Sequence, residues 1–176
     1  MKIVQAFLFL VMILIAPGCN AEITGTVVDA ETGAPIEGAV VLVEWIITKG
    51  LPGMTYHETY KVIETITDKE GMVAISGVFN PLVDPPDVTV YKRGYVAWNN
   101  KFIFPDYKKR TDFIFKNGYV FRLEHFRPEY SYNAHLEFIG GAIHSGMALG
   151  NKNLMKSAIE WEGNKAFEER QRIKMK

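Results

Sequence analysis

The sequence predicts a mainly β protein with two stacked sheets, followed by a C-terminal α-helical hairpin and preceded by an export signal. Residues 23–123 consist of short alternating apolar runs separated by turn residues, a pattern typical of antiparallel β domains. After Pro128 the apolar spacing changes to three and four residues, which is the period of a helix. An uninterrupted apolar run at residues 6–16 precedes both segments.

The first 21 residues have the layout of an export signal peptide. Lys2 precedes the apolar run and small residues follow it. The run is about half of the ~20 residues that a membrane-spanning helix needs, so a transmembrane anchor is not expected.

Two ways of processing this signal remain open. The segment Ala16-Pro-Gly-Cys19 resembles the lipobox of bacterial lipoproteins, in which the cysteine becomes the lipidated first residue of the mature chain. Alternatively, an ordinary signal peptidase would cut after Ala21. Cys19 is the only cysteine, so it has no disulfide partner in the chain, and acylation would consume a thiol that is otherwise reactive. We therefore expect lipidation of Cys19, and the resemblance implies that Asn20 directs the protein to an outer membrane.

Composition limits the partners and the size of the fold. About 155 residues remain after the signal, which suits one domain that needs no disulfides. The 20 basic and 20 acidic residues balance and show no basic stripe, so nucleic acid is not an expected partner.

The expected strands and turns follow one another in a regular order. Each strand is a short run of alternating or continuous apolar residues. Asp29-Ala-Glu-Thr-Gly33 and Asp68-Lys-Glu-Gly71 place glycine where a turn needs positive φ, and Asp84-Pro-Pro-Asp87 must be an exposed connection. The later strands are expected at residues 41–47, 60–66, 72–75, 88–91 and 119–123. One face of each strand should meet the core and the other should meet water.

Four motifs together resemble the carboxypeptidase regulatory-like domain. They are Ile23-x-Gly-x-Val-x-Asp29, Thr32-Gly-x-Pro-Ile-x-Gly-Ala-x-Val41, Thr67-Asp-x-x-Gly71 and Val90-x-x-x-Gly-Tyr95. The resemblance implies a seven-stranded Greek-key transthyretin-like β-sandwich over residues 22–125. It also implies an accessory or binding module, because the motif residues form turns and none is catalytic.

Residues 129–176 are expected to form two helices. Tyr132, Leu136, Ile139, Ile143 and Met147 recur at helical spacing, and Gly150-Asn151 should end the first helix. The second helix is expected at residues 152–173, with Leu154, Ala158 and Trp161 as its apolar stripe. We expect this hairpin to pack on its own sandwich; the alternative is that it forms the surface for a partner.

The residues that could carry catalysis show no known catalytic or metal-binding spacing. The histidines are His57, His125, His135 and His144, and none lies in a zinc-binding motif. No serine lies in a Gly-x-Ser-x-Gly context. Surface or half-buried positions are therefore expected for the histidines, with no cofactor, no metal and no catalytic residue.

The predicted function is an exported, lipid-anchored, non-catalytic binding or scaffolding module of the bacterial cell envelope, with an envelope protein or glycan as its partner. The predicted location is the periplasmic face of the outer membrane or the cell surface, or else the soluble periplasmic or secreted fraction. Two alternatives are a small secreted hydrolase or metal-dependent enzyme that uses His57, His125, His135 or His144, and a transthyretin-like carrier of small ligands.

Overall fold

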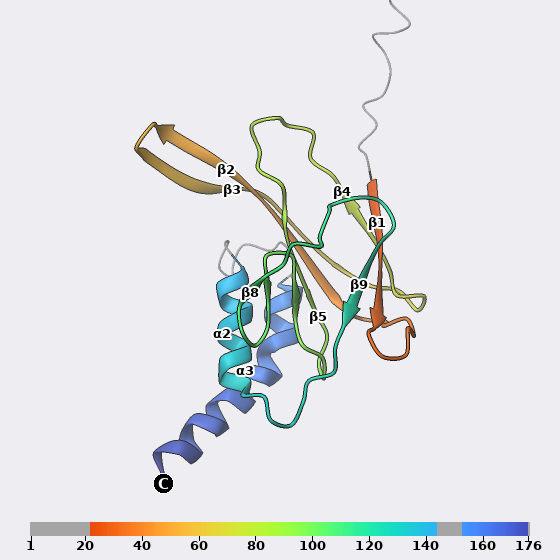
Figure 1. Cartoon of the computed structure of the whole chain (residues 1–176), viewed down its shortest axis with the longest axis vertical. Helices are drawn as coiled ribbons and strands as arrows, with labels where there is room; N and C mark the ends of the chain where they lie inside the picture. The colour runs from red at the N-terminus through yellow and green to blue at the C-terminus, as the bar shows by residue number, and fades with distance from the viewer. Residues whose placement is uncertain (1–21, 144–152, 176) are drawn as a thin grey trace, which may run out of the picture.

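The computed structural model describes residues 22–143 and 153–175 (Figure 1). Its strands are β1 (Glu22–Asp29), β2 (Val40–Leu51), β3 (Met54–Ile66), β4 (Met72–Ser76), β5 (Asp87–Tyr91), β6 (Trp98–Asn99), β7 (Phe102–Ile103), β8 (Lys108–Lys109) and β9 (Tyr119–Leu123). Its helices are α2 (Tyr132–Ala142) and α3 (Leu154–Lys174). The predictions for the leader with Cys19, for His144, for Met147 and for Gly150-Asn151 lie outside the described residues.

Two sheets form the body of the protein. One has the strand order β4-β1-β9, with β1 antiparallel to β4 and parallel to β9. The other has the order β3-β2-β5-β6, and β7 with β8 forms a small separate ladder. The predicted mainly β architecture with C-terminal helices is confirmed, and each predicted strand lies within an observed one.

In the four-stranded sheet, β5 and residues 40–46 of β2 are buried on both faces. Val41, Val43 and Trp45 point from β2 into a core shared with the three-stranded sheet. Val40 and Leu42, on the opposite face of β2, pack into a second core formed with α2 and α3. The expectation that every strand has one solvent-exposed face is therefore wrong for β2 and β5, because α2 and α3 cover the face that was expected to meet water. The unbroken apolar run of β2 is what a strand buried on both sides requires.

α2 ends earlier than the sequence predicts, whereas α3 lies close to its predicted range but buries a different line of residues. α2 ends at Ala142, and Ile143 is a buried residue with extended backbone rather than a helical one. In α3 the buried side chains are Met155, Ile159, Glu162 and Ala166, whereas the predicted stripe ran along an adjacent line of the helix. Leu154 and Ala158 of the predicted stripe are partly buried against the second core, but the prediction did not include Glu162, which lies on the fully buried line.

A carboxylate from the sheet caps α3. Asn153 precedes the helix with left-handed backbone and forms no side-chain cap. Instead, Glu64 on β3 accepts hydrogen bonds from the backbone N–H groups of Leu154 and Met155 at 3.2 and 3.1 Å. A negative charge at a helix N-terminus satisfies free N–H groups and complements the helix dipole, so Glu64 fixes α3 against the sheet.

Gly71 fits a position that alanine cannot occupy. Its φ is +71°, and a Cβ placed there would lie 2.5 Å from the backbone oxygen of Val27. We expect Gly71→Ala to lower the free energy of unfolding by more than about 2 kcal/mol, through left-handed strain plus a backbone shift. Gly33 is the control, because its φ is +72° with no atom within 4 Å of such a Cβ. Gly33→Ala should lower the free energy of unfolding, measured in urea, by only about 1–2 kcal/mol. Equal losses for the two variants would contradict the close approach of Gly71 to the Val27 backbone.

Candidate functional site

A buried polar network joins the four-stranded sheet to both helices. Glu162 on α3 accepts a hydrogen bond from the Tyr91 hydroxyl at 2.7 Å and also contacts His135 Nδ1. His135 Nε2 accepts the backbone N–H of Ala97 at 2.8 Å. Because Nε2 accepts this hydrogen bond, Nδ1 carries the ring proton and donates a hydrogen bond to Glu162. Burial, and then the Glu162 carboxylate, raise the pKa of the Tyr91 hydroxyl.

This network corrects the expectation for His135. The side chain is fully buried rather than on or near the surface. Both of its ring nitrogens already have protein partners, and it lies within an aromatic cluster that includes Phe104 and Phe138. His135 therefore stabilises the junction between sheet and helices, and it faces none of the cavities described below.

A second network surrounds Asp29 at the end of β1. Its Oδ1 accepts backbone N–H groups of Glu31 and Thr32 at 2.9 and 2.8 Å. Its Oδ2 accepts the Tyr95 hydroxyl at 3.1 Å and lies 2.8 Å from His125 Nε2. The ring of Tyr95 stacks on that of His125, with 4.6 Å between their centroids. The hydrogen bond from the Thr32 N–H is the largest of several contacts that lower the pKa of Asp29 to about 2.

Acid should weaken this second network in a defined range of pH. Because folding lowers the pKa of Asp29 from 3.8 to about 2, its stabilising contribution is complete above pH ~4 and is lost as the pH falls towards 2. We expect urea midpoints of the wild type and of Asp29→Asn to differ at pH 7 and to converge between pH ~4 and ~2. A difference that stayed constant over this range would contradict the assigned role of the Asp29 charge.

Two adjoining cavities lie beside the loop between β4 and β5, and both are walled by residues 84–86. One cavity, of about 330 Å³, reaches Trp45 and Phe115. The other, of about 400 Å³, reaches His57 on the β2–β3 hairpin and Lys101 after β6. Both cavities have mostly apolar walls, and we call the second one the polar pocket because the ionisable residues His57, Asp84, Asp87 and Lys101 line it.

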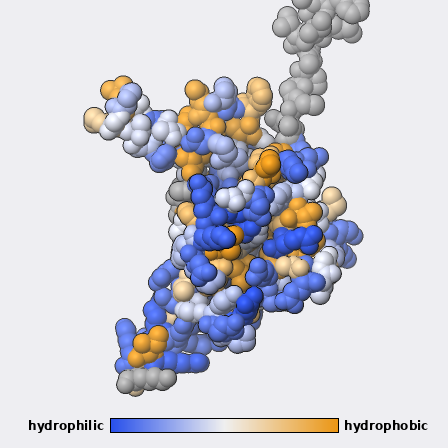
Figure 2. Space-filling model, in the orientation of Figure 1, coloured by the Kyte–Doolittle hydropathy of each residue, from blue (hydrophilic) through white to orange (hydrophobic). Residues whose placement is uncertain are grey.

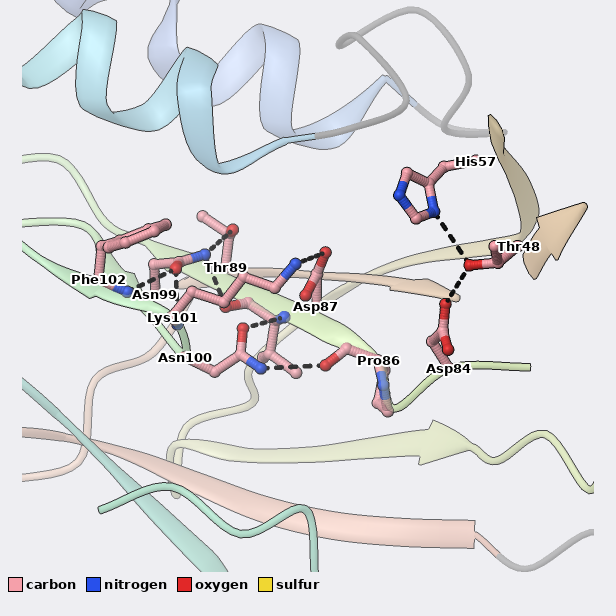
Figure 3. A network of polar contacts seen from close by, with 11 residues as sticks. Thr48, His57, Asp84, Pro86, Asp87, Thr89, Asn99, Asn100, Lys101 and Phe102 are labelled. Atoms are coloured by element: carbon pink, nitrogen blue, oxygen red, sulfur yellow. Dashed lines mark hydrogen bonds and ion pairs between the residues drawn. The ribbon is translucent and has the colours of Figure 1, made fainter. Parts of the chain in front are cut away.

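Backbone contacts hold Lys101 in the wall of the polar pocket (Figure 3). Asn99 Oδ1 accepts the backbone N–H of Lys101 at 2.8 Å, and Asn100 bonds to the backbone of Val88 and Pro86. The Lys101 ammonium lies 2.7 Å from Asp87 Oδ2.

The pocket has acidic groups on more than one element. Asp87, the first residue of β5, lines the pocket and is buried; its partner in the antiparallel β2–β5 register, the equally buried Glu44, does not line the pocket. Asp84 lies in the exposed connection that precedes β5. Carboxylates are thus close to a lysine and a histidine, and these groups can accept from or donate to a polar ligand.

Thr48 links His57 to Asp84, as Figure 3 shows. Its hydroxyl donates a hydrogen bond of 3.1 Å to Asp84 Oδ2. The same hydroxyl oxygen lies 3.1 Å from His57 Nδ1. Because the only hydroxyl proton is directed at Asp84, His57 must donate to Thr48. A hydrolytic triad needs the reverse arrangement, in which the hydroxyl donates to the histidine. This order of donors suits a positioning network rather than activation of Thr48 as a nucleophile.

The three described histidines among those proposed for an enzyme lie at separate places in the fold. His57 lies at the polar pocket, His125 beside Asp29, and His135 in the buried network, while His144 is outside the described residues. Within residues 22–143 and 153–175, no three His, Cys, Asp or Glu side chains are arranged to hold a metal ion. Neither helix in this part of the chain is long and apolar enough to cross a membrane.

Sequence reasoning identified some of these residues and missed others. Asp84 was correctly predicted to lie in an exposed connection, whereas Asp87, predicted to lie in the same connection, is buried at the start of β5; His57 was among the candidates. Lys101 was missed because the turn that brings it to Asp87 is set by asparagine contacts. Glu162 was missed, although a lone glutamate in line with Met155, Ile159 and Ala166 was a detectable signal.

Comparisons with known proteins do not assign a family. No protein-family model matches the chain, and no curated protein matches it. Among solved structures, the group B streptococcus pilus 2b backbone protein is 16% identical with a TM-score of 0.34, and the match covers 59% of this chain and 40% of that one. The streptococcal ancillary pilin is 15% identical with a TM-score of 0.31, and the match covers 61% and 30% of the two chains. The chain thus spans less than half the length of either structure, and likeness at this level assigns no function.

Proposed function

We propose that this chain is an exported, lipid-anchored, non-catalytic binding module of the bacterial cell envelope, built on a transthyretin-like sandwich of the carboxypeptidase regulatory-like type. The signal with its single cysteine supports the export and the anchor. The turns at Asp29 and Gly71, with the glycines at positive φ, support the family resemblance. In this proposal the polar pocket is the ligand site, and the ligand is a glycan or a segment of an envelope protein.

The observation that carries the binding role is the construction of the polar pocket. A cavity of about 400 Å³ is within the range of small-ligand sites, and its charged groups are held by a hydrogen-bonded frame around β5 and β6. Preorganised donors and acceptors bind hydroxyl, amide and amine groups at a low cost in side-chain entropy. The donor order at Thr48 favours binding over hydrolysis.

Fractionation of cells tests the anchor. The wild-type chain should be found in the membrane fraction, with a mass increased by acylation of Cys19. Cys19→Ser should lose the acyl mass, while Asn20→Ser, the control, should keep it. An unacylated wild-type protein would contradict the anchor.

Pull-down from envelope extracts tests the pocket. Asp84→Asn changes one charge in the pocket wall, and Asp106→Asn changes one exposed aspartate elsewhere as the matched control. We expect a specific protein or glycan to be retained by the wild type and by Asp106→Asn, and at least tenfold less by Asp84→Asn. Equal retention by the two variants would exclude the polar pocket as the ligand site.

A further inference from the structure

Large apolar side chains are exposed at one end of the molecule. Phe79 is fully exposed and Leu82 is 73% exposed, and both lie in the loop between β4 and β5. Leu51 and Met54, at the tip of the β2–β3 hairpin, are 74% and 79% exposed. Figure 2 shows the resulting apolar surface over this loop, with a smaller one at the hairpin tip. We call residues 77–86 and the hairpin tip the apolar end.

The chain enters the fold at this same end. Glu22, the first residue of β1, pairs with Ser76, and Ser76 directly precedes the exposed loop. In Figure 1 the start of β1, the β4–β5 loop and the hairpin tip all lie at the top, whereas α3 runs to the opposite end. Only Asn20 and Ala21 separate Cys19 from Glu22, so an acylated Cys19 would hold the start of β1 within about 10 Å of the lipid.

The charges at the apolar end suit insertion of apolar groups better than attraction to anionic lipids. Lys49 on the hairpin is paired with Glu58 at 2.7 Å, and Asp84 lies in the exposed loop. No basic cluster accompanies the exposed apolar residues in the described part of this end, whereas electrostatic membrane binding uses several lysines or arginines. Scattered exposed apolar residues are common, but a group of them gathered on adjacent loops indicates an interaction surface.

We propose that the apolar end is a lipid-contacting surface that inserts Phe79, Leu82 and the hairpin tip into the membrane that carries the acylated Cys19. This inference rests on the proposed lipid anchor. A lipid surface is the occupant because the short connection from Cys19 keeps this end at the bilayer. The anchor and the inserted side chains act together, since binding one raises the effective concentration of the other. The polar pocket, walled by both the loop and the hairpin, then opens beside the lipid headgroups.

The single cysteine makes a clean test possible. When Cys19 is acylated, a cysteine introduced at Phe79 or Leu82 is the only free thiol in the mature protein. Phe79→Cys and Leu82→Cys, each labelled with the environment-sensitive fluorophore NBD, are reconstituted in phosphatidylethanolamine–phosphatidylglycerol vesicles. Ile173→Cys is the control, because Ile173 is also exposed but lies near the far end of α3. We expect a blue shift and a several-fold rise in NBD emission at positions 79 and 82, insensitive to 0.5 M salt, and none at 173.

Each other result has a distinct meaning. Water-like emission at positions 79 and 82 in vesicle-bound, acylated protein would overturn the inference and leave the anchor intact. A blue shift that appears without vesicles and grows with protein concentration would overturn it in favour of self-association. If mass spectrometry finds no acyl group, the proposed anchor fails. In that case Cys19→Ser is combined with Phe79→Cys or with Leu82→Cys, so that NBD labels only the introduced cysteine. Vesicles are then added to these unacylated mature proteins. A blue shift there would still support lipid contact, and its absence would overturn it.

Discussion

Replacing Glu162 with alanine is expected to lower the free energy of unfolding by about 2–6 kcal/mol, since each of two buried donors that lose their acceptor costs about 1–3 kcal/mol. The reason is the number of groups that depend on this carboxylate. Without it, the Tyr91 hydroxyl and the His135 Nδ1–H both lose their acceptor inside the protein. Burial makes these losses costly, because neither donor can turn to water. Urea unfolding at neutral pH, followed by circular dichroism, measures the difference.

Two further variants separate this network from a general effect of mutating α3. Glu162→Gln keeps one acceptor for the His135 N–H, and its amide can donate to the Tyr91 oxygen, so we expect a loss of only about 1 kcal/mol. Glu160→Ala, on the exposed side of α3, should stay within about 0.5 kcal/mol of the wild type. If Glu162→Ala behaved like Glu160→Ala, the carboxylate would not be the connection between the sheet and the helices.

The network also shows what the sequence could and could not predict. The strands of the sandwich were predictable because apolar alternation and turn residues act over a few positions, as at Asp68 and Gly71. The junction was not predictable, because it depends on residues as far apart as Tyr91 and Glu162, which are 71 positions apart. A charged residue in a helix is normally assigned to solvent, and only its partners in space reverse that assignment.

The candidate site, too, could be predicted from the sequence only in part. The Asp84-Pro-Pro-Asp87 connection was recognisable because proline cannot continue a central strand. The position of Lys101 beside Asp87 depends on Asn99 and Asn100, whose side chains bond to the neighbouring strand. Propensity and periodicity contain no information on such contacts. The same applies to Glu64, which accepts the N–H of Leu154 at the start of α3 although the two residues are 90 positions apart.

The last prediction concerns whether the helical hairpin belongs to the core or is a detachable surface. Phe138 on α2 is buried. Its ring packs edge-on against the rings of Phe104 and Tyr107, with 5.6 and 5.4 Å between the ring centroids. We expect Phe138→Ala to lower the free energy of unfolding by about 3–5 kcal/mol, through lost apolar contact and the cavity left behind. Phe167→Ala removes the same side chain from a position on α3 that is 56% exposed, and should change stability by less than about 0.5 kcal/mol.

These two phenylalanines distinguish the two roles of the hairpin. A large loss for Phe138→Ala alone, in a single unfolding transition, means that sheet and helices unfold together. A chain that stops before α2 would then expose the face of β2 that carries Val40 and Leu42, and would leave the Ala97 N–H without its acceptor. Such a fragment should aggregate, so partner binding has to be tested with point variants of the whole chain. A loss below about 1 kcal/mol for Phe138→Ala would instead mean that α2 is loosely docked and free to bind a partner.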